Sequence, residues 1–214
     1  MGGRGTSSGI GGGSRTFNHL HEANTFFGVG ESKGMFPDWQ KDITAEEKDA
    51  AVYYTTNAYK EINKWLRGVG GLDPKQAPEK VKNTAARVTT AADKFNLTEN
   101  ITVWRGGSNK LVGGASTIEQ VKAMIGAVVQ DKGIMSTAVT AGAMWDKSGG
   151  NIGYEIEVPK GRGRGFFVDP ISAHHGEQEF TLKPGTHFKI TGAYTDTHGN
   201  VICKLRVLTK KVKT

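Results

Sequence analysis

The chain has 214 residues, which suits one domain of ordinary size with room for an added arm. Its only cysteine is Cys203, which excludes an intramolecular disulfide and cysteine-rich zinc or iron–sulfur sites. No apolar run approaches the ~20 residues that span a bilayer, and the N-terminus lacks the apolar core of a secretory signal, so we expect a soluble chain without a membrane partner. The net charge of +7 favours polyanionic partners, but the basic residues are scattered, and a solvated surface is the simpler interpretation.

The N-terminal segment is rich in glycine. Half of the first fourteen residues are glycine, with Ser, Thr and Arg among most of the others. Such a stretch buries too little apolar surface to offset the entropy of ordering it. We therefore expect a flexible arm over residues 1–34, with Phe26 and Phe27 as a docking point, and a folded domain over residues 35–214.

Helices are predicted for the first half of the folded domain. Thr44 and Glu47 form a T-x-x-E capping box, and apolar residues then follow at mostly helical intervals over residues 45–67, with a break around residues 55–57. Glycines from residue 68 end this helix. Further helices are expected over residues 78–95 and 117–130.

Strands are predicted for the second half. A β-prone run at residues 101–104 is the first of them, and the others are expected at residues 154–158, 165–168, 178–182, 187–194 and 201–208. The turn at residues 197–200 joins the last two strands as a hairpin. Helices followed by strands indicate an α+β fold rather than a doubly wound parallel sheet.

Two candidate sites have simpler explanations. His174 and His175 lie near Glu177 and Glu179, but adjacent histidines on a loop rarely share one metal ion and no third ligand is obvious, so we expect no metal. The Gly-Arg-Gly-Arg-Gly segment at residues 161–165 resembles a short piece of an RNA-binding tail. With two arginines, it is more simply a mobile basic turn.

Three short motifs carry more chemical information as a set than singly. Arg105 ends a strand and precedes Gly106, so its guanidinium can bind phosphate where the backbone is approachable. Ser136 belongs to a Met-Ser-Thr-Ala stretch. Glu177 and Glu179 form an E-x-E pair, whose carboxylates emerge on one side if the stretch is extended. Taken alone, each has an ordinary structural explanation as a surface or strand-edge group.

Together, in this order and at these spacings, the three motifs resemble the Arg, Ser-Thr-Ser and Glu-x-Glu signature of mono-ADP-ribosyltransferases of the R-S-E class. The resemblance is closest to bacterial ADP-ribosylating exoenzymes, notably the catalytic components of clostridial binary toxins that modify actin. It extends upstream, where Tyr54, Tyr59 and Asn63 are spaced like residues that line the family's NAD site. It covers roughly residues 39–208. It implies an ADP-ribosyltransferase fold, with two packed, mainly antiparallel sheets, an N-terminal helical part and the NAD cleft between the sheets.

The resemblance also implies roles for individual residues. Glu179 would stabilise the positive charge that develops on the ribose when the nicotinamide bond breaks, while Glu177 would orient and help deprotonate the acceptor. Glutamate at the position of Glu177 accompanies arginine acceptors in the family. Ser136 would hold Glu179 and the nicotinamide ribose, and His174 would touch the target protein. The implied NAD contacts are Arg105, Gly106, Tyr54, Tyr59, Asn63, Ser136 and Thr137.

The sequence departs from the family pattern at three places. Its second motif ends in Ala138 instead of a second serine, although the first serine is present. The second phosphate-binding arginine of relatives is missing before residues 154–158, where Lys147 is the nearest candidate. The aromatic residue that clamps nicotinamide in relatives has no match at its usual spacing, and Trp145 is the candidate substitute.

The sequence thus predicts an NAD-dependent, protein-arginine mono-ADP-ribosyltransferase with NAD as co-substrate. By resemblance it is a monomer with an actin-like target. It would be either a secreted effector or toxin, or a phage-encoded intracellular enzyme. One alternative keeps the fold but modifies nucleic acid, in keeping with the basic charge. The other is a non-catalytic structural or binding module with a degenerate cleft, against which the intact Arg105, Ser136, Glu177 and Glu179 argue.

Overall fold

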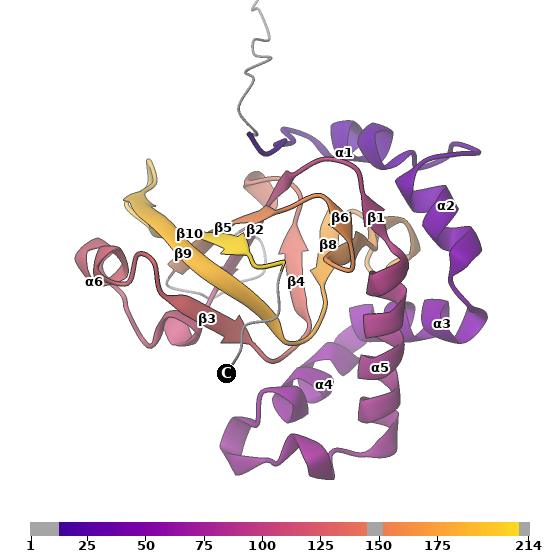
Figure 1. Ribbon diagram of the computed structural model, residues 1–214, viewed down its shortest axis with the longest axis horizontal. Coiled ribbons are helices and arrows are strands. Elements are labelled where there is room, and N and C mark those ends of the chain that lie inside the picture. The colour runs from indigo at the N-terminus through magenta and orange to yellow at the C-terminus, as the bar shows by residue number, and fades with distance from the viewer. Residues whose placement is uncertain (1–12, 145–151, 210–214) are drawn as a thin grey trace, which may run out of the picture.

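The computed structural model describes residues 13–144 and 152–209. Within them, five helices precede the first long strand, and Figure 1 shows these helices gathered along one side of the sheet. Their bounds are α1 Leu20–Phe27, α2 Met35–Asp42, α3 Ala45–Tyr53, α4 Tyr59–Leu66 and α5 Glu79–Lys94. The short helix α6, Ile118–Ala123, lies at the far end of the sheet beside β9. Helices followed by strands confirm the α+β class.

An eight-stranded sheet forms the second half, in the order β3-β9-β10-β5-β2-β4-β8-β7. All of its neighbouring pairs are antiparallel except β10 and β5. The strands are β2 Ile101–Gly107, β3 Val128–Asp131, β4 Met135–Ala138, β5 Ile152–Val158, β7 Gly165–Phe167, β8 Glu179–Leu182, β9 Thr186–Thr195 and β10 Val201–Val207. The strands β1, Asn96–Leu97, and β6, Gly161–Arg162, form a separate small ladder.

The large sheet is joined weakly at one point. Strands β2 and β4 pair through a single residue pair, Trp104 with Ala138, whereas β2 pairs with β5 along seven residues. This junction separates five strands, from β3 to β2, from the three strands β4, β8 and β7. Arg105 follows Trp104 in β2, and Ser136 lies two residues before Ala138 in β4, so both motifs lie beside this junction.

Local signals explain the helical part. Thr44 accepts from the amide of Glu47, and the Glu47 side chain accepts from the amide of Thr44, so the predicted capping box is confirmed. The predicted break is a kinked turn, Tyr54–Ala58, between α3 and α4, in which Thr56 has non-helical backbone angles of φ −78° and ψ −177°. The helical path is therefore interrupted at Thr56.

The folded body begins earlier than residue 35. Phe17 and Phe27 are buried, and the Phe27 ring stacks on Phe167 of β7 with 4.4 Å between ring centroids. Arg15 pairs with Ile101 at the start of β2. The sequence analysis grouped this stretch with the glycine-rich arm because its composition is mixed. In the structure, the aromatic residues Phe17 and Phe27 of this stretch are buried in the core.

The predicted helix over residues 117–130 is wrong beyond Ala123. Gly126 takes a left-handed backbone conformation with φ of 96°, which ends the helical path, and its amide donates to the carbonyl of Ile190 in β9. The β-branched pair Val128 and Val129 then continues as strand β3 against β9.

Candidate active site

A cavity of about 340 Å³ opens between the α3–α4 region, the β2–β4 junction and the loop before β8. All ten residues predicted for the site line it. They are Tyr54, Tyr59, Asn63, Arg105, Gly106, Ser136, Thr137, His174, Glu177 and Glu179. Four separate segments of the chain therefore converge on one cavity, as the resemblance implied.

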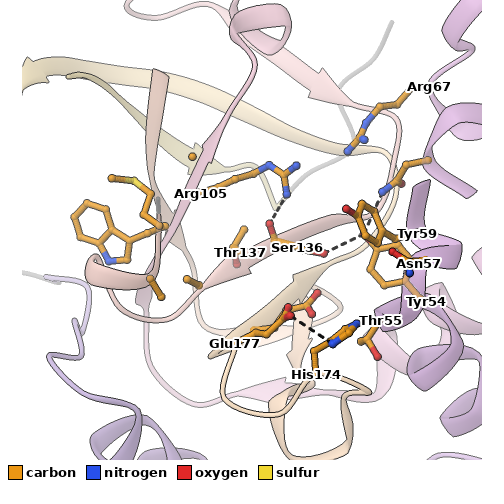
Figure 2. Close-up of a pocket in the computed structure, with 17 residues that line it drawn as sticks. Tyr54, Thr55, Asn57, Tyr59, Arg67, Arg105, Ser136, Thr137, His174 and Glu177 are labelled. Atoms are coloured by element: carbon orange, nitrogen blue, oxygen red, sulfur yellow. Dashed lines mark hydrogen bonds and ion pairs between the residues drawn. The ribbon is translucent and has the colours of Figure 1, made fainter. Parts of the chain in front are cut away.

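Arg105 and Ser136 meet across the sheet junction. The Arg105 guanidinium donates to the Ser136 carbonyl oxygen, which holds the arginine against β4. Figure 2 shows Ser136 between Arg105 on one side and Glu177 on the other. The serine thus lies between the guanidinium of Arg105 and the carboxylate of Glu177.

The Tyr54 hydroxyl is the centre of a buried hydrogen-bond network. It donates to the Ile134 carbonyl at 3.0 Å, accepts from Asn63 Nδ2 at 3.1 Å and lies 3.1 Å from Ser136 Oγ. Burial, and then the negative charge of Glu179, raise the pKa of Tyr54 to about 12. The phenol therefore stays protonated at neutral pH and serves as a fixed hydrogen-bonding group that positions Ser136 and Asn63.

Glu179 lies on the first residue of β8 and is 5% exposed. Thr181, two residues along the same face of the strand, donates its hydroxyl hydrogen to Glu179 Oε1 at 2.8 Å. Glu179 pairs with Ala138 of β4, and Thr181 pairs with Ser136, so the serine and the carboxylate are diagonal neighbours across the two strands. The sheet register thus fixes Glu179 beside Ser136.

Glu177 precedes β8 on a loop and is more accessible. Its side chain is 26% exposed, and Glu177 Oε1 lies 3.9 Å from Nδ1 of His174, whose side chain is 55% exposed. The E-x-E stretch is not extended. Gln178 between the two glutamates has φ of 60°, so the chain turns sharply there. Both carboxylates still line the cavity, one deep and one at its mouth.

Arg67 is a second guanidinium at the cavity. It forms two hydrogen bonds with the Asp131 carboxylate, at 2.7 and 2.8 Å. Burial alone would lower the pKa of Arg67, but the hydrogen bonds and charge of Asp131 outweigh it and raise that pKa. Arg67 and Arg105 extend toward the same part of the cavity (Figure 2). The sequence analysis gave Arg67 no role.

Sequence reasoning missed several further lining residues, which are Thr55, Asn57, Trp104, Ala138, Ala143 and Met144. Thr55 and Asn57 belong to the kinked turn between α3 and α4, which the sequence indicated only as a break in the helix. Trp104 could have been predicted as a lining residue because it precedes Arg105 in the sequence. The two proposed substitutes, Trp145 and Lys147, lie outside the described residues.

The other two candidate sites have structural roles here. The His175 ring nitrogen Nδ1 lies 3.0 Å from the Asp169 carbonyl, and Arg162 of the basic turn donates to the Lys94 carbonyl at 3.2 Å. Across residues 13–144 and 152–209, no three His, Cys, Asp or Glu side chains are grouped so as to hold a metal ion. Nor does any helix in those ranges have the length and apolar character needed to cross a membrane.

Comparison with protein families decides the wider assignment. The model of the ADP-ribosyltransferase exoenzyme family matches residues 32–210. The chain belongs to this family. A search of curated protein sequences finds no significant match.

Solved structures of this ADP-ribosyltransferase family share the fold. The toxin Plx2a from Paenibacillus larvae is 23% identical with a TM-score of 0.75, and the match covers 91% of this chain and 99% of that one. C3stau2 from S. aureus, solved with NAD, is 19% identical with a TM-score of 0.76, and the match covers 92% of this chain and 99% of that one. BECa of a C. perfringens binary enterotoxin, solved with NADH, is 18% identical with a TM-score of 0.71, and the match covers 91% of this chain and 50% of that one. The predicted ADP-ribosyltransferase fold is confirmed. C3-type and binary-toxin enzymes both appear among these structures, so a special closeness to binary toxins stays a prediction.

Proposed function

We propose that this ADP-ribosyltransferase transfers a single ADP-ribose from NAD to an arginine side chain of a protein. The observation that carries the proposal is the pair of glutamates in one cavity with different surroundings. Glu179 is buried and held by a hydroxyl donor, whereas Glu177 lies on the loop at the mouth beside His174. One carboxylate is therefore suited to NAD and the other to an acceptor arriving from solution.

The described residues fit NAD. The cavity volume falls within the ~300–1,000 Å³ of ordinary small-molecule sites. Arg105 and Arg67 place two guanidinium charges at the cavity, and their N–H groups that do not bind Ser136 or Asp131 can donate to phosphate oxygens. We assign Arg105 and Arg67 to the diphosphate, and Tyr54, Tyr59, Asn63, Gly106 and Thr137 to the walls around NAD. Arg67 takes the place of the second phosphate-binding arginine that was missing before β5.

The chemistry follows from the two carboxylates. The bond between ribose C1′ and the nicotinamide nitrogen breaks, and neutral nicotinamide leaves with the electron pair. Glu179, oriented by Thr181 and next to Ser136, stabilises the positive charge that develops on the ribose. A guanidine nitrogen of the acceptor then forms the new bond to C1′ and transfers its proton to Glu177.

The acceptor assignment rests on Glu177. A free guanidinium stays protonated and is a poor nucleophile, so it needs a carboxylate that orients it and accepts its proton as the new bond forms. Glu177 supplies that group at the mouth of the cavity. His174, whose side chain is 55% exposed, is the side chain that would contact the target protein. Water can take the place of the acceptor, so slow NAD hydrolysis accompanies transfer.

The proposal is tested with labelled NAD and a cell lysate. Labelled material is separated by protease and nuclease treatment, and the modified residue is located by mass spectrometry. We expect labelled protein with ADP-ribose on arginine, and no label with Glu179→Gln. Label found on nucleic acid would show that nucleic acid, and not a protein arginine, is the acceptor. If wild-type protein neither labels the lysate nor consumes NAD, the non-catalytic binding module takes its place.

A further inference from the structure

The turn between the two glutamates is conformationally unusual. Gln178 has φ of 60°, and among the described residues it is the only one other than glycine with a positive φ. The left-handed region is unfavourable for residues that carry a Cβ, at a cost of ~1 kcal/mol or more. A glutamine held there must be kept in place by its surroundings.

Asp169 provides the main restraint on this turn. Its carboxylate accepts from the amide of Gln178 at 2.5 Å and from the amide of Gly176 at 3.4 Å. Asp169 is 5% exposed and does not line the cavity. It therefore binds the backbone on both sides of Glu177 without reaching the substrate-binding space.

Other contacts complete the restraint. The Gln178 carbonyl accepts from the amide of Val139, and the Thr140 hydroxyl donates to the Gln178 side-chain oxygen. At the start of the loop, the amide of Ala173 donates to Thr55 Oγ1 at 2.9 Å, which ties the loop to the turn between α3 and α4. These contacts hold the two ends of the loop. Between those ends, the Glu177 amide donates to the His174 carbonyl at 3.4 Å, and the Asp169 carboxylate binds the amides on both sides of Glu177.

We propose that Asp169 is a positioning residue that holds Glu177 over the cavity in the left-handed turn at Gln178, and so decides how much ADP-ribose goes to arginine and how much to water. This inference rests on the proposed function. Glu179 is fixed by β8 and by Thr181, so its geometry does not depend on Asp169. The glutamate that serves the acceptor does depend on it. Losing the restraint therefore impairs transfer selectively.

The first test is the variant Asp169→Ala with two readouts from one reaction. Agmatine, a small guanidine, serves as the acceptor, and released nicotinamide and ADP-ribosyl-agmatine are both measured. We expect the rate of transfer to fall at least tenfold, while NAD hydrolysis without acceptor changes less than threefold. The matched control is Asp93→Ala, which removes a surface carboxylate bound to Lys183 and leaves both rates unchanged. Equal loss of both activities would overturn the proposal.

A series at position 178 tests the backbone directly. Glycine and asparagine tolerate the left-handed conformation, whereas a β-branched valine does not. All three variants lose the side-chain contact with Thr140, so differences among them report the backbone conformation. We expect the ratio of transfer to hydrolysis to stay near wild type for Gln178→Gly and Gln178→Asn and to fall at least tenfold for Gln178→Val. No difference within the series would refute the inference.

A rescue experiment separates positioning from general stability. In the Asp169→Ala background, Gln178→Gly removes the conformational cost that the carboxylate offsets, so at least part of the lost transfer returns. An aspartate needed only for folding gives no such return. If Asp169→Ala does not fold, the series at position 178 in the wild-type background decides the question alone.

Hydrogen exchange keeps the inference apart from the proposed function. The amide of Gln178 is protected by its bond to Asp169 and loses that protection in Asp169→Ala, whether or not the protein turns over NAD. Protection lost together with selective loss of transfer supports both ideas. Protection lost without any wild-type activity refutes the proposed function and leaves the structural restraint standing. If the Gln178 amide stays protected in Asp169→Ala, the proposed restraint is refuted.

Discussion

Replacing Tyr54 with phenylalanine removes one oxygen atom from the most connected group in the cavity. The ring is 1% exposed, so phenylalanine keeps the packing. The change leaves the Asn63 amide without its acceptor and the Ile134 carbonyl without its closest side-chain donor. Each unsatisfied buried group costs ~1–3 kcal/mol. Because Arg67 also donates to Ile134, at 3.4 Å, we expect a total loss of about 2 kcal/mol of unfolding free energy.

The assay is thermal unfolding of Tyr54→Phe beside a matched control. For a domain of this size, ~2 kcal/mol lowers the melting temperature by about 4–8 °C. The control is Tyr59→Phe, which removes the same atom from a residue of the same cavity that is 42% exposed, and which we expect to be neutral. Catalysis should also fall in Tyr54→Phe, because Ser136 then loses a hydrogen-bond partner.

The pH dependence gives a sharper signature of the same hydroxyl. The pKa of Tyr54 is raised from 10.0 to about 12 in the folded protein, so the unfolded chain loses this proton first as the pH rises. The contribution of the Tyr54 hydroxyl to the free energy of unfolding is therefore fully present below pH 10 and is lost as the pH rises through the pKa of Tyr54 in the folded protein. The stability advantage of wild type over Tyr54→Phe should therefore shrink by about 1 kcal/mol between pH 9 and pH 11. A constant difference across that range, or equal melting of the two tyrosine variants at pH 7, would refute the reasoning.

Three further substitutions test other parts of the site. Thr181→Val removes the hydroxyl that donates to Glu179 and should lower the rate of nicotinamide release about tenfold, because hydrogen bonds to charged groups contribute ~1.5–3 kcal/mol. Arg67→Ala leaves Asp131 without its guanidinium partner, so we expect a higher KM for NAD and about 2 kcal/mol lower stability in denaturant unfolding. Gly165→Ala should destabilise the fold severely in a melting experiment, since its Cβ would collide with the backbone carbonyl of Thr181.

Each of these variants has a control within the chain. Thr191→Val removes an exposed hydroxyl of β9 and should leave nicotinamide release unchanged. Gly142→Ala places a Cβ where no atom lies within 4 Å and should melt like wild type. Arg67→Lys keeps the charge but loses the paired N–H donors, so it should fall between wild type and alanine. An alanine at position 165 that melts like one at position 142 would contradict the packing described for β7 and β8.

Local chemistry was the part of the molecule that the sequence predicted well. The capping box at Thr44, the break before Tyr59 and the final hairpin each depend on residues close together in the chain. The ten site residues were predicted because their motifs resemble a family whose model matches the chain. Their convergence on one cavity agrees with the predicted set, while their individual roles stay predictions.

Tertiary context decided what the sequence did not predict. Val128 and Val129 form a strand because they pair with β9, which lies far along the chain. Phe27 belongs to the core because Phe167, far along the chain, stacks on it. The turn at Gln178 depends on a buried carboxylate several residues earlier, and no local turn signal announces it.

The central claim is that Glu179 drives cleavage of NAD and Glu177 directs its product to arginine. The most direct measurement follows nicotinamide release and ADP-ribosyl-agmatine formation together for wild type, Glu177→Gln and Glu179→Gln. The account predicts that Glu179→Gln loses both products, and that Glu177→Gln loses transfer while NAD hydrolysis persists. Transfer retained by Glu177→Gln, or NAD cleavage retained by Glu179→Gln, would contradict it.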